Sequence, residues 1–248
     1  MKKLIINADD FGLNTSVNKA IIESFEKGLI NSTTIMANMP GFDEAIELAH
    51  KYNITNKIGI HLTLTEGQPL TTNILISKLY NEHNSDITKY KRKLFFLVKK
   101  EKKIIYDELA AQIIKVRNAG IKTTHIDTHL HTHEVWTITQ IIFQLLRDYK
   151  IPSMRILNNL NRSTGYYKAG YRNLINKLIK VKGVNNSDYF GNQQQAIWQL
   201  EQYPMFFKTK TLEIMVHPDY NDHRVIIDKI KDREVSFKYP EILRRQLL

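Results

Sequence analysis

Short apolar runs alternate along the chain with longer segments whose apolar residues recur at helical spacing. Runs rich in β-branched residues predict six strands, at Lys3–Ala8, Ser32–Met36, Lys57–Leu62, Thr123–Asp127, Pro152–Leu157 and Thr211–Val216. Helical spacing predicts helices at Thr15–Lys27, Gly41–Tyr52, Tyr106–Asn118, Val135–Tyr149, Tyr171–Val181 and around Gln193–Glu201, with two short helices closing the chain. This order of strand and helix predicts an α/β fold, in which a parallel sheet or barrel carries helices on its outside.

Residues 63–103 interrupt this alternation. They predict a long excursion with its own helix, which could close over a site as a lid. Barrels of alternating strands and helices reach the 248 residues of this chain as single domains. We therefore expect one barrel domain over residues 1–248, with an inserted helical excursion at about 63–103.

Polar sequences follow four of the predicted strands. They read NADDFG, GIHLTLTEG, HIDTHLHTH and MVHPDY, and each begins where an apolar strand ends. Ligands bind at the carboxyl ends of the strands in parallel α/β folds. Four segments that are far apart in sequence are therefore expected to converge on one site.

Two adjacent acids, Asp9 and Asp10, end the first predicted strand. Adjacent carboxylates repel each other and gain little in folding unless a cation lies nearby. One could bind a metal ion while the other serves as general base. The same residues are equally typical of a turn, or of a cap for the helix that begins near Thr15.

Four of the nine histidines lie close together in one segment. His125, Asp127, His129, His131 and His133 occupy every second position, and alternate side chains of a strand point to the same face. Side chains two residues apart are separated by roughly 7 Å, too far for all four imidazoles to share one ion. One or two are therefore expected to bind metal, while the others bind substrate or support the ligands.

Three further polar residues lie near predicted strand ends. His61 ends the third strand, His217 follows the last one, and Arg155 lies in the fifth. His217 is a candidate general acid that Asp219 could orient, and Arg155 could pair with Asp9 or stabilise an oxyanion. Each also has an ordinary interpretation as a hydrogen-bonded structural residue.

Composition narrows the chemistry. The chain has no cysteine, so disulfides and thiolate zinc sites are excluded, and any metal must be bound by His, Asp or Glu. No apolar run approaches the roughly 18 residues of a membrane span, and the N-terminus lacks a signal-peptide pattern. We therefore expect a cytoplasmic protein without stable membrane insertion. Much of the net charge of +11 lies in Lys89–Lys103, whose simplest interpretation is a solvated helix face.

The motifs together resemble those of the YdjC-like carbohydrate deacetylases, a family that includes chitooligosaccharide deacetylases. The shared elements are NADDFG, GIHLTLTEG with His61, THIDTHLHTH with His125 and Asp127, and a late VHP, and they run in order from residue 3 to about residue 218. The sequence departs from the family at Leu130, where the family often has a histidine. The resemblance implies a distorted (β/α) barrel related to the NodB-type polysaccharide deacetylases, with parallel strands and outer helices.

The resemblance also implies an activity. The family hydrolyses the N-acetyl group of an amino sugar or oligosaccharide and releases acetate, with a divalent metal that is usually magnesium and alternatively zinc. Carried over residue by residue, the metal ligands would be Asp10, His61 and His125, the base Asp9 and the acid His217, although the two acids could exchange roles. The candidate substrate contacts are Asp127, His129, His131, His133 and Arg155. The resemblance further implies a homodimer.

Three other functions fit parts of the sequence. A metal-dependent phosphoesterase on a similar barrel would use the same residue types and often two metals, so the number of ions bound per chain separates the two activities. A nucleic-acid-binding protein would use Lys91–Lys103, but no recognition motif accompanies that stretch. An inactive sugar-binding module is disfavoured by the intact set Asp10, His61 and His125. The sequence does not say whether the sugar is free, phosphorylated or lipid-linked.

Overall fold

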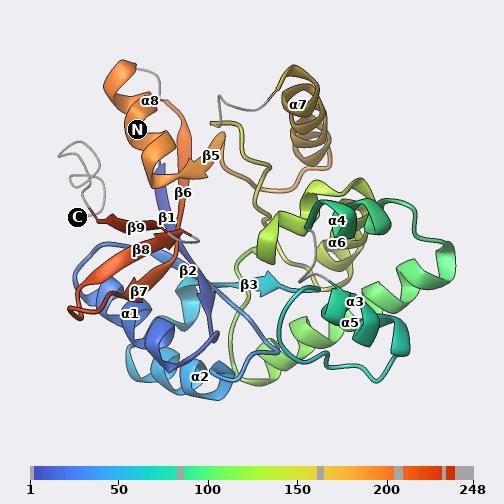
Figure 1. Cartoon of the computed structure of the whole chain (residues 1–248), viewed down its shortest axis with the longest axis horizontal. Coiled ribbons are helices and arrows are strands. Elements are labelled where there is room, and N and C mark those ends of the chain that lie inside the picture. Colours follow the sequence, from blue (N-terminus) through green and yellow to red (C-terminus); the bar gives the residue numbers. More distant parts are fainter. Residues whose placement is uncertain (1–2, 83–86, 161–164, 204–208, 231–232, 238–248) are drawn as a thin grey trace.

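A curled sheet of six parallel strands forms the centre of the molecule (Figure 1). The computed structural model describes residues 3–82, 87–160, 165–203, 209–230 and 233–237. The strands follow the order β4-β3-β2-β1-β6-β5. Their bounds are β1 (Lys3–Phe11), β2 (Ser32–Ile35), β3 (Ile58–Leu62), β4 (Ile126–Thr128), β5 (Tyr189–Asn192) and β6 (Thr211–Val216). The sheet curls into a half-barrel with helices around it, which confirms the predicted fold class.

Strand β1 lies in the middle of this sheet and is covered on both faces. Leu4, Ile6 and Ala8 on one face are at most 4% exposed, and Asn7 and Asp9 on the other face are at most 2% exposed, as expected for a parallel strand that is covered on both sides. β1 pairs with β2 on one edge and with β6 on the other. The first and the last long strands of the chain therefore meet, and their polar carboxyl ends lie side by side.

Helices surround the sheet close to the predicted places, although the two predicted from Tyr106 and Tyr171 begin earlier, at Lys99 and Tyr166. Their bounds are α1 (Thr15–Glu26), α2 (Phe42–Lys51), α5 (Lys99–Asn118), α6 (Trp136–Asp148), α7 (Tyr166–Val181) and α8 (Gln193–Gln202). Two short 3₁₀ segments, η1 (Thr55–Lys57) and η2 (His129–Glu134), precede β3 and α6. The start of α1 is fixed by Asn14, whose side-chain oxygen accepts a hydrogen bond from the Val17 amide at 3.0 Å.

The excursion after β3 contains two helices, α3 (Ile74–Glu82) and α4 (Ile87–Phe95), before α5 begins. A fully buried carboxylate, Glu108 on α5, holds its first part in place. Glu108 accepts hydrogen bonds from the Thr71 amide at 2.8 Å, the Thr71 hydroxyl at 2.7 Å and the Leu70 amide at 3.1 Å. The extent of a single domain around this excursion stays a prediction.

One predicted strand of the central sheet is irregular, and one strand of that sheet was not predicted. Pro152–Leu157 forms no regular strand and makes two isolated parallel bridges, Ile126↔Met154 and Ser153↔Asn185. β5 was not predicted, because its four residues YFGN carry no alternation and a glycine. The bridged segment still runs beside β4, since the Arg155 amide donates to the Ile126 carbonyl at 2.9 Å.

The prediction of two closing helices is wrong for the described part of the chain end. Residues 218–236 form the antiparallel strands β7 (Pro218–Tyr220), β8 (Ile226–Ile230) and β9 (Arg233–Ser236). The side chain of Asn221 accepts from the amides of His223 and Val225, and Arg224 adopts a left-handed φ of 57°. This turn chemistry favours a hairpin over a helix. The small sheet packs beside α1 (Figure 1).

No helix in the described ranges combines the length and the apolar character that crossing a bilayer requires.

Candidate active site

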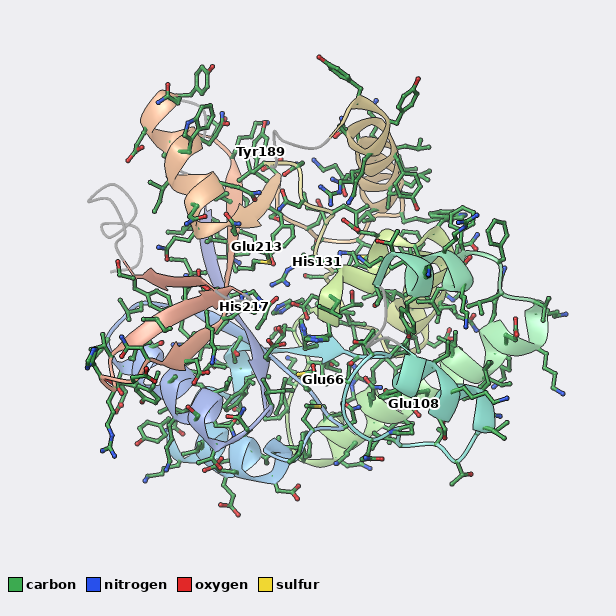
Figure 2. The ribbon with its side chains drawn as sticks, in the orientation of Figure 1. Glu66, Glu108, His131, Tyr189, Glu213 and His217 are labelled. Atoms are coloured by element: carbon green, nitrogen blue, oxygen red, sulfur yellow. The ribbon has the colours of Figure 1, made fainter. Side chains whose placement is uncertain are left out.

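The four polar segments meet at the carboxyl ends of the central strands. Figure 2 shows Glu66, His131 and His217 around the centre of the molecule, each from a different segment. Glu66 follows β3, His131 lies in η2, and His217 follows β6. The structure thus brings together the strand ends that sequence reasoning expected to converge.

Asp9 and Asp10 reach this site together because β1 is irregular there. The pairing of β1 with β2 shifts register between Ala8 and Phe11, and Asp10 has a left-handed φ of 69°. In a regular strand, neighbouring side chains point to opposite faces. The bulge turns Asp10 so that both carboxylates contact site residues.

Asp10, His61 and His129 form a group that can hold a metal ion. One ligand atom from each lies within 4.8 Å of the other two. Asp10 Oδ1 is 3.2 Å from His61 Nε2 and 3.2 Å from His129 Nδ1. Two imidazoles and one carboxylate are a common ligand set for a catalytic divalent ion that keeps positions open. These residues therefore fit the metal that the resemblance implies.

The charge of the surroundings also favours a cation. Burial alone lowers the pKa of His61, but the neighbouring Asp127 and Asp10 outweigh it and raise the pKa well above the ordinary value of 6.5. The pKa of His129 is likewise raised against burial, by Asp10 and Glu66. Both histidines thus sit in a negative potential, which favours a divalent ion over an empty site.

Arg155 is the buried cation that organises the carboxylates. Its side chain is 0% exposed, and it binds Asp9 with two hydrogen bonds of 2.7 Å. It also contacts Asp127 at 2.6 Å and Glu213 at 2.6 Å. Burial raises the pKa of Asp9, but Arg155 outweighs it and holds this pKa far below the ordinary value of 3.8. Asp9 is therefore ionised over the whole working range of pH.

His217 faces Asp9 from the end of the neighbouring strand β6. Its Nε2 lies 4.0 Å from Asp9 Oδ2, and its Nδ1 lies 3.7 Å from Asp228 Oδ1 on β8. Burial opposes the charged imidazole, but Asp228, Asp9 and Asp10 outweigh it and raise the pKa of His217 to about 9. An imidazolium is thus held beside a carboxylate, as an acid–base pair requires.

His131 and His133 form one wall of the site. His131 Nδ1 and His133 Nε2 are buried, and neither has a hydrogen-bond partner among the described residues. Leu130 and His131 both adopt left-handed φ angles, 51° and 52°. The His131 ring packs against Phe190, with the ring centroids 5.8 Å apart. Unpaired buried nitrogens on a strained segment are typical of a place where a ligand completes the hydrogen bonds.

Comparison with known proteins now decides the family. The family described as "YdjC-like protein" matches residues 3–245. The chain belongs to the YdjC-like family.

Two curated relatives of this YdjC-like chain share one name, and a similar solved structure carries another. A "Carbohydrate deacetylase" from Clostridium beijerinckii is 31% identical over 246 residues, covering 99% of this chain and 91% of the relative. A "Carbohydrate deacetylase" from Geobacillus stearothermophilus is 37% identical over 218 residues, covering 88% and 80%. A solved structure from Enterococcus faecalis, described as a putative cellobiose-phosphate cleavage protein, is similar with a TM-score of 0.68 and 30% identity, covering 90% of this chain and 83% of that one.

The geometry of the YdjC-like chain corrects the expectation for His125. Its Nε2 contacts the Asn7 side chain at 3.2 Å and its Nδ1 the Thr124 hydroxyl at 2.8 Å. It lines a cavity of about 420 Å³ that also includes Lys3 and Thr211, the first residues of β1 and β6. His125 therefore lies toward the amino ends of the strands, one layer away from the metal group, and His129 takes its place there.

The His125 ring lies near the amino ends of the strands because it packs directly against Gly59 of β3. A Cβ on Gly59 would lie 2.5 Å from the His125 ring, so only glycine leaves room for the imidazole on β3. His125 and Asp127 point to the same side of β4, as the alternation predicts, and pair with Gly59 and His61 respectively. Because His125 lies two residues before Asp127, its imidazole lies beside Gly59 and away from the imidazole of His61.

Two candidate substrate contacts are also corrected. Asp127 and Arg155 both have side chains that are 0% exposed. The oxygens of Asp127 are taken by His61, Thr34 and Arg155. Neither side chain presents a surface to a sugar, so both support their neighbours. The pairing of Arg155 with Asp9 was one of the two roles expected for it.

Sequence reasoning missed three carboxylates of the site. Glu213 contacts Arg155, Asp228 lies behind His217, and Glu66 contacts His129. Glu213 interrupts the apolar strand TLEIMV, and a lone acid in a buried strand is a signal for a buried cation. Asp219, which was expected to orient His217, instead accepts from the Ser16 hydroxyl and contacts Lys229.

Proposed function

We propose that this chain is a metal-dependent carbohydrate deacetylase, which hydrolyses the N-acetyl group of an amino sugar or oligosaccharide and releases acetate and a free amine. One observation supports it most: the metal-binding group Asp10, His61 and His129 lies beside Asp9, which faces His217. Amide hydrolysis needs an electrophile, a base and an acid within reach of one bond. The names of the curated relatives agree.

The metal would be held by Asp10, His61 and His129. These residues would thereby supply a Lewis acid that could polarise the acetyl carbonyl and make a nearby water more acidic. The donor set carries two nitrogens and one carboxylate. Magnesium prefers oxygen ligands, whereas zinc accepts imidazole readily. We therefore propose zinc, or a transition ion of similar preference, ahead of the magnesium that the family resemblance implies.

Asp9 would act as the general base. Arg155 keeps its carboxylate ionised and fixes its plane with two hydrogen bonds, and a third comes from the Asn7 amide at 2.8 Å. An ionised carboxylate offers about four lone-pair positions, so Asp9 retains room to accept the proton of the attacking water. Its low pKa makes it a weak base, which suits a water that has already been made acidic.

His217 would act as the general acid. Its raised pKa, about 9, keeps the ring protonated at neutral pH. Protonation of the departing nitrogen is required because an amide anion is a poor leaving group. His131, which is partly exposed, would contact a sugar hydroxyl, and the buried His133 ring lies against it, with the ring centroids 5.9 Å apart.

The alternative of a phosphoesterase receives no support. A second group of possible ligands, Asp9, His61 and Asp127, shares His61 with the first. Arg155 already binds Asp9 and Asp127 at 2.7 and 2.6 Å, so a guanidinium occupies the place of a second cation. A site built for two metals would leave those carboxylates free.

Acetate release tests the proposal. Purified protein is incubated with N-acetylglucosamine, diacetylchitobiose and their phosphorylated forms, after metal removal and after reloading with zinc, manganese or magnesium. We expect acetate from at least one sugar, loss of release with chelator and recovery with metal, most completely with zinc. Release that is indifferent to chelator, or no release from any N-acetylated sugar, would contradict the proposal.

The homodimer implied by the resemblance and the cytoplasmic location expected from the sequence both stay predictions. The homodimer is checked by sedimentation equilibrium of the purified chain. The cytoplasmic location is checked by fractionating cells that express it from its own gene.

A further inference from the structure

Each imidazole of the metal-binding group has a carboxylate on its far ring nitrogen. His61 turns Nε2 toward Asp10, and its Nδ1 donates to Asp127 at 2.8 Å. His129 turns Nδ1 toward Asp10, and its Nε2 lies 3.0 Å from Glu66 Oε2. The two rings therefore use opposite nitrogens toward the ion, and a different acid stands behind each.

We propose that Glu66 is a positioning residue that fixes His129 in the form that binds metal. A neutral imidazole carries one N–H and one lone pair, and an ionised carboxylate only accepts. Glu66 thus requires the proton on Nε2, which leaves the Nδ1 lone pair pointing at the position shared with Asp10 and His61. The inference rests on the metal-dependent site of the proposed function.

The backbone around Glu66 is held from both sides. Its amide donates to the Thr63 hydroxyl at 3.3 Å, and its carbonyl accepts from the Asn38 side chain at 2.8 Å. Gly67 has a φ of +83°, and a Cβ there would lie 2.5 Å from Met39 Sδ. Only glycine fits this turn, so the loop after β3 presents Glu66 from a fixed anchor.

Glu66 differs from Asp127 in how much of the structure depends on it. Asp127 is 0% exposed and also binds Arg155, so its removal would disturb the buried ion cluster. Glu66 is 44% exposed, so its removal leaves a space that water can fill. Substitution of Glu66 therefore reports on His129 rather than on the fold.

Two variants separate positioning from direct binding of the ion. Glu66→Ala removes the acceptor, while Glu66→Gln keeps an amide oxygen that can accept from His129 Nε2. Loss of a carboxylate behind a ligand histidine costs about 10–100-fold in metal affinity. We expect that loss in Glu66→Ala and most of the affinity to return in Glu66→Gln. Glu47→Ala, at an exposed glutamate of α2, is the matched control.

The experiment uses the full chain stripped of metal. Zinc and manganese affinities are measured by competition with a chromophoric chelator, and the ¹⁵N shifts of the His129 ring report which nitrogen is protonated. At a pH high enough for the His129 ring to be neutral, we expect the Nε2–H form in the metal-free parent and in Glu66→Gln, and a mixture of the two neutral forms in Glu66→Ala. Unchanged affinity and ring shifts in Glu66→Ala would overturn the inference. Equal losses in Glu66→Gln and Glu66→Ala would also overturn it, because Glu66 would then itself be a ligand.

Failure of this inference and failure of the proposed function are distinguishable. Affinity and ring shifts need no sugar, so they can support the role of Glu66 even if no acetate is released. Conversely, acetate release by the parent together with parental metal affinity in Glu66→Ala would overturn the inference alone.

Discussion

Asp10 illustrates how one backbone angle creates the site. Its left-handed φ of 69° costs of order 1–3 kcal/mol for most residues, and aspartate and asparagine tolerate it best. In return, both acids of the pair reach the same end of the barrel. A bulge of this kind is not visible in the sequence, where NADDFG reads as a strand end followed by a turn.

The assignment of the second metal histidine is directly testable. We expect His129→Ala to lose bound metal and activity together, because His129 is one of the three residues proposed to hold the ion. His125→Ala should keep its metal, because His125 contacts Asn7 and Thr124 instead. Metal content per chain, measured by elemental analysis of both purified variants, decides between them. Metal loss in His125→Ala with retention in His129→Ala would contradict the structure.

The pKa of His217 predicts a limit on the alkaline side. A general acid must be protonated, so turnover of the metal-loaded enzyme should fall as pH rises through about 9. Asp228 is the first of the groups that raise this pKa against burial. Asp228→Asn keeps an oxygen for the His217 amide and removes the charge, so the limit should move to lower pH. A profile of kcat against pH that is the same in both proteins would contradict this role.

At the scale of elements, the loops after the strands are fixed by buried polar residues. Glu108 on α5 accepts from two backbone amides and one hydroxyl of residues 70–71. Among the described residues, these donors have no hydrogen-bond acceptor other than Glu108. The start of the excursion is thereby tied to the barrel, and Glu66 lies a few residues before it.

Replacing Glu108 should destabilise the fold. Leaving buried donors unpaired costs about 1–3 kcal/mol, and more when the acceptor was charged. We expect Glu108→Ala to lower the free energy of unfolding by about 3 kcal/mol, and Glu108→Gln, which keeps one acceptor oxygen, to lower it less. Urea unfolding of the three proteins measures this. Equal stability of Glu108→Ala and the parent would show that the excursion is held in another way.

Elements whose apolar residues recur with a clear period could be predicted from the sequence, and short elements could not. Helices α1 and α6 and strands β1 and β6 lie where the apolar spacing places them. β4 has only three regular residues, so the strand ends at Thr128 and the chain turns into η2. Because of this turn, His129 lies beside Asp10 and His61, whereas His125 lies toward the amino ends of the strands. The alternation of side chains correctly predicted that His125 and Asp127 point to the same face. It gave no information on how far each side chain lies from the carboxyl ends of the strands.

At the scale of the whole molecule, one guanidinium connects strands from across the sheet. Arg155 contacts Asp9 on β1, Asp127 on β4 and Glu213 on β6, all within 2.7 Å. Three buried carboxylates face one buried cation there. The excess of negative charge is shared with the neighbouring metal-binding group, so the same residues that hold the barrel together also attract its ion.

Removing Arg155 should therefore lower stability in a way that depends on pH. Arg155→Met leaves three buried carboxylates without a cation, which costs about 3–5 kcal/mol when a buried pair is broken. In the parent, Asp9 has a lowered pKa, so its stabilising contribution is present above the ordinary value of 3.8 and is lost as pH falls through the folded pKa. In the variant, burial raises the pKa of these acids, so folding is favoured at low pH and opposed as pH rises.

The opposite pH dependences of stability in the parent and in Arg155→Met lead to one expected result. The stability deficit of Arg155→Met should be large near neutral pH and smaller at about pH 5, where the variant's buried acids can bind protons. Urea unfolding of both metal-free proteins at the two pH values measures the deficit. Arg155→Lys keeps a charge but lacks the planar fork that reaches three carboxylates, so it should recover only part of the loss. A deficit that is the same at both pH values would mean that the carboxylates are not what Arg155 balances, and that its role is packing against Phe190, whose ring lies 4.7 Å from the guanidinium carbon.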